Sequence, residues 1–405
     1  MSGDDYSQRA CSPSMPAHLY IHVPFCASKC GYCDFSSIAD APSSVVSTVF
    51  TGIRTQIQHW ASASLDGVVD TIYVGGGTPS LHPSEVIRVV DFAHDVLTIR
   101  NGAEITVEAN PDSLDLEIAR AFAGAGVTRV SVGVQSFDDT VLRVLGRRHS
   151  AKAAWDACQA VRDAGLDLSV DLICGVPGQS TTSWSETLAR AVTTGARHAS
   201  VYPLSIEDGT PLQVAVGTGL LDEPDPDAAA DMMILAEATL GYYALNRYEV
   251  ANYAEGREYE SRHNTAYWSG RSYIGVGPGA HGMVDAETAR VVGLLDPSDE
   301  RTARVRYANA GDIDEWLVGR GDTVEMLASD EAAREDVMLG MRLVRGVPKR
   351  QVDAARLTRV LESLAVDGLV ELASDALSKP GPNWRTTRRG WLLGNEVFSR
   401  IWAGE

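Results

Sequence analysis

The hydrophobic pattern of residues 18–255 alternates between short β-rich runs and stretches with helical periodicity. One such stretch repeats apolar residues at spacings of three and four, as expected for a helix with one buried face: Val46, Val49, Phe50, Ile53, Ile57 and Trp60. The pattern predicts six strands at Leu19–Val23, Thr71–Val74, Ile105–Glu108, Arg129–Val134, Leu168–Ile173 and Ser200–Leu204.

Glycines mark the ends of three of the intervening helices. Gly126, Gly165 and Gly195 each stand just before the next predicted strand, where a helix commonly ends in a left-handed residue. Six strand–helix units in series imply a parallel sheet covered by helices. The fold class is therefore predicted to be α/β, as a partial (β/α)6 barrel resembling an incomplete TIM barrel.

The predicted strands end in polar or glycine-rich residues. Taken singly, each of these residues could merely terminate a strand. Because parallel strands present their carboxyl ends at one edge, where α/β proteins bind ligands, we interpret them together as the rim of one site: Gly75, Gly76, Gly77, Thr78, Glu108, Gln135, Asp171 and Tyr202.

The remainder of the chain differs in character. Residues 1–17 are predicted to be disordered, residues 18–255 to form the partial barrel, and residues 256–325 to form an irregular connecting region. Helical periodicity returns at Glu331–Arg345 and Leu357–Asp367, followed by a short hairpin. Residues 326–405 are therefore predicted to form a small winged-helix-like domain with a packing or lid role.

Composition and charge exclude several classes of function. An apolar fraction of 44% is typical of a folded globular chain. The formal net charge of −19 disfavours general nucleic-acid binding, and no apolar run is long enough for a membrane-spanning helix. Because the polar N-terminal residues also lack a secretion-signal pattern, we expect a cytoplasmic protein that is not an integral membrane protein.

Three of the six cysteines lie in one short segment, Cys26-Ala-Ser-Lys-Cys30-Gly-Tyr-Cys33, directly after the first predicted strand. Disulfides are disfavoured in a long cytosolic chain. A zinc site would need a fourth ligand, which His22 could supply. Iron–sulfur chemistry suits three clustered thiolates better: a four-iron cluster held by three cysteines keeps one iron open to a further ligand. Cys11, Cys158 and Cys174 have no assigned role, and the last two are expected to be packed.

The Cys-x3-Cys-x2-Cys spacing after a first strand resembles the signature of the radical S-adenosylmethionine (SAM) superfamily. Further motifs resemble the oxygen-independent coproporphyrinogen III oxidase group: Tyr20-Ile-His-Val-Pro-Phe-Cys26, Gly75-Gly-Gly-Thr-Pro-Ser80, Glu108-Ala-Asn-Pro111, Ser131-Val-Gly-Val-Gln-Ser-Phe137 and Asp171-Leu-Ile-Cys-Gly-Val-Pro-Gly-Gln179. The resemblance covers residues 18–405.

This resemblance implies cofactors and residue roles. Cys26, Cys30 and Cys33 would ligate a 4Fe–4S cluster, whose open iron would bind SAM. The remaining family positions would contact the cluster or SAM: Tyr20 and Tyr32 beside the cluster and adenosyl group, the backbone of Gly76, Gly77 and Thr78 at the SAM ammonium and carboxylate, and Glu108, Gln135, Arg147 and Asp171 at its ribose, carboxylate and adenine edges. Without the resemblance, Arg147 could belong to a solvated charge run.

Two features distinguish the chain from the oxidases it resembles. Those oxidases carry a fourth cysteine where this chain has Phe35, and they have a longer N-terminal arm. The heme-chaperone subgroup instead has a His-Asn-x-x-Tyr-Trp element, present here as His263–Trp268. Imidazole commonly ligates heme iron, so His263 is a tentative heme ligand, with packing in the protein interior as the alternative.

The leading hypothesis is a heme chaperone that binds heme, a 4Fe–4S cluster and SAM. It would pass heme to an acceptor protein, possibly a respiratory, membrane-associated one. The alternatives are a coproporphyrinogen III oxidase, or another radical SAM enzyme acting on a tetrapyrrole, and a zinc-stabilised interaction protein. Both cleavage of SAM and a role of SAM as a ligand of the cluster alone are compatible with these residues.

Overall fold

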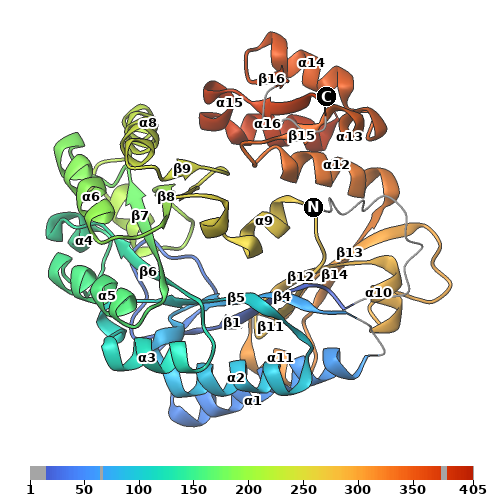
Figure 1. The fold of residues 1–405 in the computed structure, drawn as a ribbon, viewed down its shortest axis with the longest axis horizontal. Helices are drawn as coiled ribbons and strands as arrows, with labels where there is room; N and C mark the ends of the chain where they lie inside the picture. The colour runs from blue at the N-terminus through green and yellow to red at the C-terminus, as the bar shows by residue number, and fades with distance from the viewer. Residues whose placement is uncertain (1–14, 64–66, 375–380, 405) are drawn as a thin grey trace.

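In a computed structural model, which describes residues 15–63, 67–374 and 381–404, one long curved sheet forms the body of the protein (Figure 1). Its twelve strands run in the order β14-β13-β12-β11-β1-β4-β5-β6-β7-β8-β10-β9. The order β1-β4-β5-β6-β7-β8 in its middle follows the chain, as expected for repeated right-handed strand–helix–strand units.

These six strands confirm the predicted barrel strands. They are β1 (His18–Val23), β4 (Val69–Gly76), β5 (Ile99–Ala109), β6 (Arg129–Gln135), β7 (Asp167–Cys174) and β8 (His198–Pro203). Within this group each strand pairs in parallel with the next, with Tyr20 opposite Tyr73 and Asp171 opposite Ser200. The register therefore brings the predicted rim residues to the same end of the sheet.

The helices that follow these strands cover the outer, convex face of the sheet (Figure 1). They are α1 (Ser43–Ser62), α2 (Pro83–Val96), α3 (Leu116–Gly124), α4 (Asp139–Val144), α5 (Ala151–Asp163), α6 (Thr181–Thr193) and α8 (Pro226–Tyr242). The buried face of α1 consists of the six apolar residues predicted for it. Gly126, Gly165 and Gly195 have φ values of 86°, 79° and 80°, which confirms their predicted role after helix ends.

Side chains alternate along each parallel strand between the helix-covered face and the barrel interior. On β7, Leu168, Val170 and Leu172 belong to the main hydrophobic core, whereas Ser169 and Asp171 line an interior cavity. The same alternation places Ile105 and Val107 in the core and Thr106 and Glu108 in the cavity wall. The core thus supports the strands from outside and leaves their inner face polar.

Residues 256–325 differ from the irregular connection predicted for them. After η3 (Arg257–Tyr259) and α9 (Arg262–Trp268) they form β11 (Tyr273–Val276), β12 (His281–Asp285), α10 (Ala286–Val291), β13 (Thr302–Ala308), α11 (Ile313–Leu317) and β14 (Thr323–Ala328). The first of these strands pairs in parallel with β1, and the others extend the sheet in antiparallel order. The apolar runs here are short and interrupted by glycine, which concealed the strands.

At the other end of the sheet, β9 (Asn246–Arg247) and β10 (Asn252–Ala254) add two short antiparallel strands beside β8. Helix α9 then crosses the concave side of the sheet (Figure 1). The backbone N–H groups of Arg262 and His263 donate to the Glu104 carboxylate at 3.0 and 3.1 Å, which fixes the start of α9 to β5.

The C-terminal residues form a small separate module above the sheet (Figure 1). It consists of α12 (Ser329–Gly340), α13 (Lys349–Ala354), α14 (Thr358–Val366), α15 (Arg388–Leu392), α16 (Gly394–Ala403) and a three-stranded sheet of β15 (Val347–Pro348), β17 (Asn383–Thr386) and β16 (Val370–Ala373). Its own core, which includes Leu361, Leu364 and Ile401, agrees with the predicted helix–helix–hairpin module.

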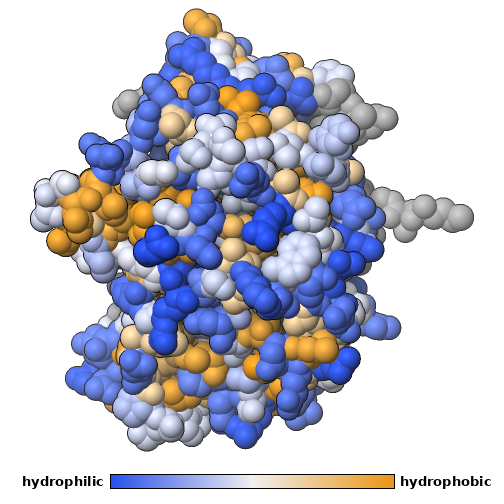
Figure 2. Space-filling model, turned by 90° about the vertical axis from the view of Figure 1, so that its left-hand side faces the viewer, coloured by the Kyte–Doolittle hydropathy of each residue, from blue (hydrophilic) through white to orange (hydrophobic). Residues whose placement is uncertain are grey.

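The predicted disorder of residues 1–17 is wrong for its last three residues. Met15 and Pro16 are buried, and the Ala17 carbonyl accepts from Asp70 N–H at 2.6 Å. Residues 1–14, including Cys11, lie outside the described residues. Within the described residues no helix is long and apolar enough to cross a membrane. Seen from the side of its outer helices, the protein has a predominantly hydrophilic surface with separate apolar areas (Figure 2).

The packing of α6 predicts that two leucine substitutions will differ widely in their effect on the free energy of unfolding. Leu188 is fully buried against the sheet, whereas Leu220 is 79% exposed. Leu188→Ala should lower the free energy of unfolding by about 2–5 kcal/mol because it opens a core cavity. Leu220→Ala should change it by less than about 0.5 kcal/mol. Urea denaturation of both variants measures the difference, and equal losses would contradict this assignment of the core.

Candidate functional site

The three clustered cysteines lie on a loop that leaves the end of β1 and is fixed at several points. The loop begins at β2 (Phe25–Cys26) and closes on β3 (Ile38–Ala39), where Ile38 N–H donates to the Pro24 carbonyl at 2.7 Å. At its tip, Gly31 N–H donates to the Leu145 carbonyl, and the Gly31 carbonyl accepts from Leu212 N–H at the start of α7 (Pro211–Gly217). The thiols are therefore held against the strand ends.

His22 also orders this loop. Its Nε2–H donates to the Ser36 carbonyl at 2.9 Å, and its Nδ1 accepts from the Tyr20 hydroxyl at 3.0 Å. Both ring nitrogens are thus engaged within the protein. This arrangement argues against the predicted alternative in which His22 completes a zinc site.

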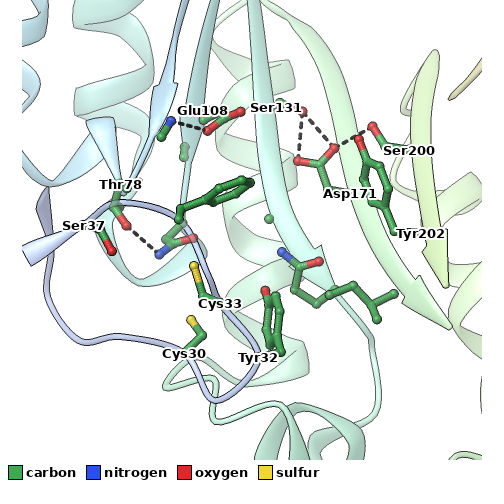
Figure 3. Close-up of a pocket in the computed structure, with 18 of the residues that line it drawn as sticks. Cys30, Tyr32, Cys33, Ser37, Thr78, Glu108, Ser131, Asp171, Ser200 and Tyr202 are labelled. Atoms are coloured by element: carbon green, nitrogen blue, oxygen red, sulfur yellow. Dashed lines mark hydrogen bonds between the residues drawn. The ribbon is translucent and has the colours of Figure 1, made fainter. Parts of the chain in front are cut away.

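A cavity of about 570 Å³ lies between the cysteine loop and the inner face of the sheet. Figure 3 shows Cys30, Tyr32 and Cys33 on one side of it, with Glu108, Ser131 and Asp171 on the strands opposite. The predicted site residues that line it are Cys26, Cys30, Tyr32, Cys33, Gly76, Gly77, Thr78, Glu108, Gln135, Arg147 and Asp171. This volume is typical of a cofactor or small-molecule site.

Two of the thiols lie within hydrogen-bond distance of a donor side chain. Arg147 Nη1 lies 3.3 Å from Cys30 Sγ, and its Nη2 donates to Asn110 Oδ1 at 2.7 Å. Thr78 Oγ1 lies 3.6 Å from Cys26 Sγ and accepts from Asn110 Nδ2. Arg147 is therefore part of the cavity wall and not of a solvated charge run.

The described residues include no group of three or more His, Cys, Asp or Glu side chains arranged around a single metal ion. Cys26, Cys30 and Cys33 are instead distributed along one wall of the cavity. Three thiols facing a common space, two of them beside hydrogen-bond donors, form a donor set that fits a polynuclear iron–sulfur cluster.

Two buried carboxyl groups face the loop from the strands. Burial raises the pKa of Glu108 to about 7, although Tyr73 Oη–H and Gly76 N–H donate to it at 2.7 and 3.0 Å. Burial likewise raises the pKa of Asp171 to about 6, despite hydrogen bonds from Ser131 and Ser200. Such perturbed carboxyl groups in a cavity are typical of functional sites.

The glycine run at the end of β4 permits a close approach of backbone segments. A Cβ atom at Gly77 would lie 2.5 Å from the Phe25 carbonyl oxygen, and one at Gly75 would lie 2.9 Å from the Glu108 carboxyl carbon. The N–H groups of Gly77 and Thr78 donate to the Val23 and Phe25 carbonyls. Both donors are therefore engaged within the protein and hold the end of β4 against the start of the cysteine loop.

Gln135 ends β6 in a strained conformation. Its φ of 62° lies in the left-handed region, which non-glycine residues adopt rarely. The space for its side chain comes from Gly133, where a Cβ would lie 2.9 Å from Gln135 Nε2. Strain of this kind is concentrated at functional sites, so Gln135 stays a candidate for the predicted site.

Two predicted site residues lie behind the cavity wall. Tyr20 is stacked on Tyr73, and His263 is 1% exposed. The His263 Nδ1 is hydrogen-bonded to Thr71 Oγ1 at 2.7 Å and its Nε2 to Tyr267 Oη at 2.9 Å. The structure therefore does not support direct heme ligation by His263, because both nitrogens already have partners inside the protein.

Sequence reasoning missed Tyr73, Asn110, Ser131 and Ser200, which hold the predicted residues in place. A signal for three of them was present, since Tyr73, Ser131 and Ser200 are inward positions of strands with alternating polarity. Asn110 lies inside the Glu108–Pro111 motif, where no role is predicted for it. The cavity also includes Asn264, from the same element as His263.

The comparisons with known proteins agree with this geometry. The profile of the radical SAM superfamily matches residues 20–191, and that of the HemN C-terminal domain matches residues 327–393. The fold is similar to that of HemN, the coproporphyrinogen III oxidase of Escherichia coli that is a radical SAM enzyme. Its TM-score is 0.78 at 20% identity, over 97% of this chain and 91% of that one. These findings define a radical SAM protein with a HemN-like C-terminal domain.

Relatives of similar length show to which group of radical SAM proteins the chain belongs. The heme chaperone HemW of Mycobacterium tuberculosis is 36% identical over 397 residues, which cover 96% of this chain and 95% of that protein. HemW of Bacillus subtilis is 32% identical, covering 94% and 97%. The mitochondrial radical S-adenosyl methionine domain-containing protein 1 of Bos taurus is 39% identical, covering 82% and 75%. The chain belongs to the HemW family of radical SAM proteins.

The raised pKa of Glu108 predicts a pH dependence of stability. Between its ordinary pKa near 4.5 and about 7, the folded protein retains a proton that the unfolded chain releases. The contribution of Glu108 to the free energy of unfolding should therefore fall as pH rises through this window, whereas buried histidines with a lowered pKa, such as His263, contribute in the opposite direction. Glu108→Gln should remove its contribution, so the change in the free energy of unfolding from pH 5 to 7 should be more positive than in the wild type, whereas Glu117→Gln, on the exposed face of α3, should leave it unchanged. Urea unfolding of the ligand-free protein at pH 5 and 7 tests this, and equal changes in all three proteins would contradict it.

Proposed function

We propose that this protein is a heme chaperone that binds heme, a 4Fe–4S cluster and SAM and transfers heme to an acceptor protein in the cytoplasm. The observation that carries the proposal is the similarity to HemW heme chaperones across nearly the whole chain. The cavity supports it, because the thiol loop and the strand-end residues of the motifs converge there.

Cys26, Cys30 and Cys33 would hold the cluster. Arg147 and Thr78 lie within hydrogen-bond distance of two of these thiols, and such contacts stabilise thiolates and tune cluster potential. When bound, a three-cysteine cluster supplies an iron with an open coordination position for the amino and carboxylate groups of SAM.

The opposite wall would hold the rest of SAM. Glu108 presents a buried carboxylate beside the Gly76–Thr78 backbone, which suits the SAM ammonium. Gln135, Arg147 and Asp171 line the same cavity and could hydrogen-bond the ribose, carboxylate and adenine. Tyr32, on the cysteine loop, offers an aromatic face beside the cluster.

The heme contact is proposed for the His263–Trp268 element of α9. Asn264 is the residue of this element that lines the cavity, so it is the first candidate for contact with heme or its propionates. An acceptor protein, possibly a respiratory one at the membrane, would then receive the heme.

Coproporphyrinogen III oxidation is the second candidate, favoured by the fold similarity to HemN. Phe35 argues against it. This residue lines the cavity, is 64% exposed, and occupies the position at which the oxidases carry a further cysteine. The phenylalanine ring supplies apolar surface at this position but lacks the thiol that the oxidases have there.

Two anaerobic assays of the cluster-loaded protein distinguish these functions. Heme titration should give saturable binding, and the heme-loaded protein should transfer heme to an apo-hemoprotein acceptor. With SAM, a reductant and coproporphyrinogen III, protoporphyrinogen formation should stay at background. Asn264→Ala tests the heme contact, because it should weaken heme binding by about fivefold if one hydrogen bond of about 1 kcal/mol is lost. Protoporphyrinogen formation at a rate comparable to that of HemN, without heme binding, would refute the chaperone function.

A further inference from the structure

We propose that His263 is a positioning residue for the SAM site, acting through Tyr73 on the Glu108 carboxylate, and not an axial ligand of heme. The inference rests on the proposed function in one respect, that Glu108 contacts SAM. It gives the histidine of the His-Asn-x-x-Tyr-Trp element a role that its place in the fold supports.

The His263 ring is held on all sides by the protein interior. Its Nδ1 is bonded to Thr71 on β4, and its Nε2 to Tyr267 one turn further along α9. Thr71 Oγ1 is also bonded to His18 Nδ1 at 2.9 Å. Burial lowers the pKa of His263 to about 3, so the ring is neutral and can donate one of these hydrogen bonds and accept the other.

The face of this fixed ring packs against Tyr73. The two ring centroids are 5.2 Å apart with an interplanar angle of 27°, and Tyr20 stacks at 6.1 Å and 28°. Offset stacking of this kind stabilises the mutual orientation of aromatic rings. His263 and Tyr20 therefore both restrict the orientation of the Tyr73 ring.

Tyr73 in turn fixes the carboxylate at the cavity. Its hydroxyl donates to Glu108 Oε1 at 2.7 Å, and Gly76 N–H donates to Oε2 at 3.0 Å. A Cβ at Gly75 would lie 2.8 Å from Tyr73 Cε1 and 2.9 Å from Glu108 Cδ, so the glycine permits this close packing. Burial raises the pKa of Tyr73, which keeps its hydroxyl protonated as a donor.

Heme ligation by His263 would require this arrangement to break. The side chain is 1% exposed and does not line the cavity, whereas its neighbours Ser261 and Asn264 do. To reach an iron, the ring would have to leave Tyr73 and give up the bond to Thr71 or Tyr267. A link between α9 and the SAM site needs no such change.

Three variants of the cluster-loaded protein separate the two roles. His263→Ala removes the stacked ring, His263→Phe keeps a ring that cannot ligate iron, and Tyr73→Phe keeps the stack but removes the bond to Glu108. The matched control is His59→Ala, an exposed histidine on α1. For each protein, the Kd for SAM is measured by equilibrium binding under anaerobic conditions, and the heme stoichiometry and absorption spectrum by titration.

We expect the Kd for SAM to rise by about three- to tenfold in His263→Ala and in Tyr73→Phe, the equivalent of one aromatic pair or one hydrogen bond. His263→Phe should stay within about threefold of the wild type. Heme stoichiometry and spectrum should be unchanged in all variants. The rescue by phenylalanine is specific to positioning, because phenylalanine has no iron-binding atom.

The proposal is overturned if His263→Ala and His263→Phe both lose heme binding or alter its spectrum while the Kd for SAM is unchanged. If His263→Ala does not fold, Tyr73→Phe keeps the inference testable, because an unchanged Kd in that variant also overturns it. A wild-type protein that binds neither heme nor SAM would refute the proposed function itself, which is a separate result.

Discussion

The alternation of side chains along the parallel strands is the constraint on which the whole site depends. One set of positions packs under the helices and supplies the stability that holds the sheet curved. The other set points inward. These side chains can be polar because they are not part of the hydrophobic core under the helices. Ser131, Ser169, Asp171 and Ser200 share the concave face for this reason. The cysteine loop closes over that face and turns it into a cavity.

This constraint explains what could be predicted from the sequence. The six parallel strands and the helix-ending glycines carry strong local signals, and the ends of parallel strands must meet at one edge. Cys26, Glu108 and Asp171 could therefore be assigned to one site from these signals and the motifs alone. The strands of residues 256–325 could not be predicted, because β11 gains its stability from pairing with β1, about 250 positions earlier in the chain.

The interior position of His263 could also not be predicted from the sequence. A histidine beside aromatic residues has the same appearance whether it faces a ligand or packs inside. Only the fold places Thr71 and Tyr267 at its two nitrogens and Tyr73 on its face. His263 thus lies behind the cavity wall, whereas Asn264 of the same element lines the cavity.

The iron and sulfide content after anaerobic reconstitution tests most directly that the three thiols jointly hold a cluster in the cavity. We expect about four irons and four sulfides per chain. Both should be lost when Cys26, Cys30 and Cys33 are all replaced by alanine but retained in Cys158→Ala, which changes a buried cysteine outside the site. Equal iron and sulfide in the triple variant and the wild type would contradict it.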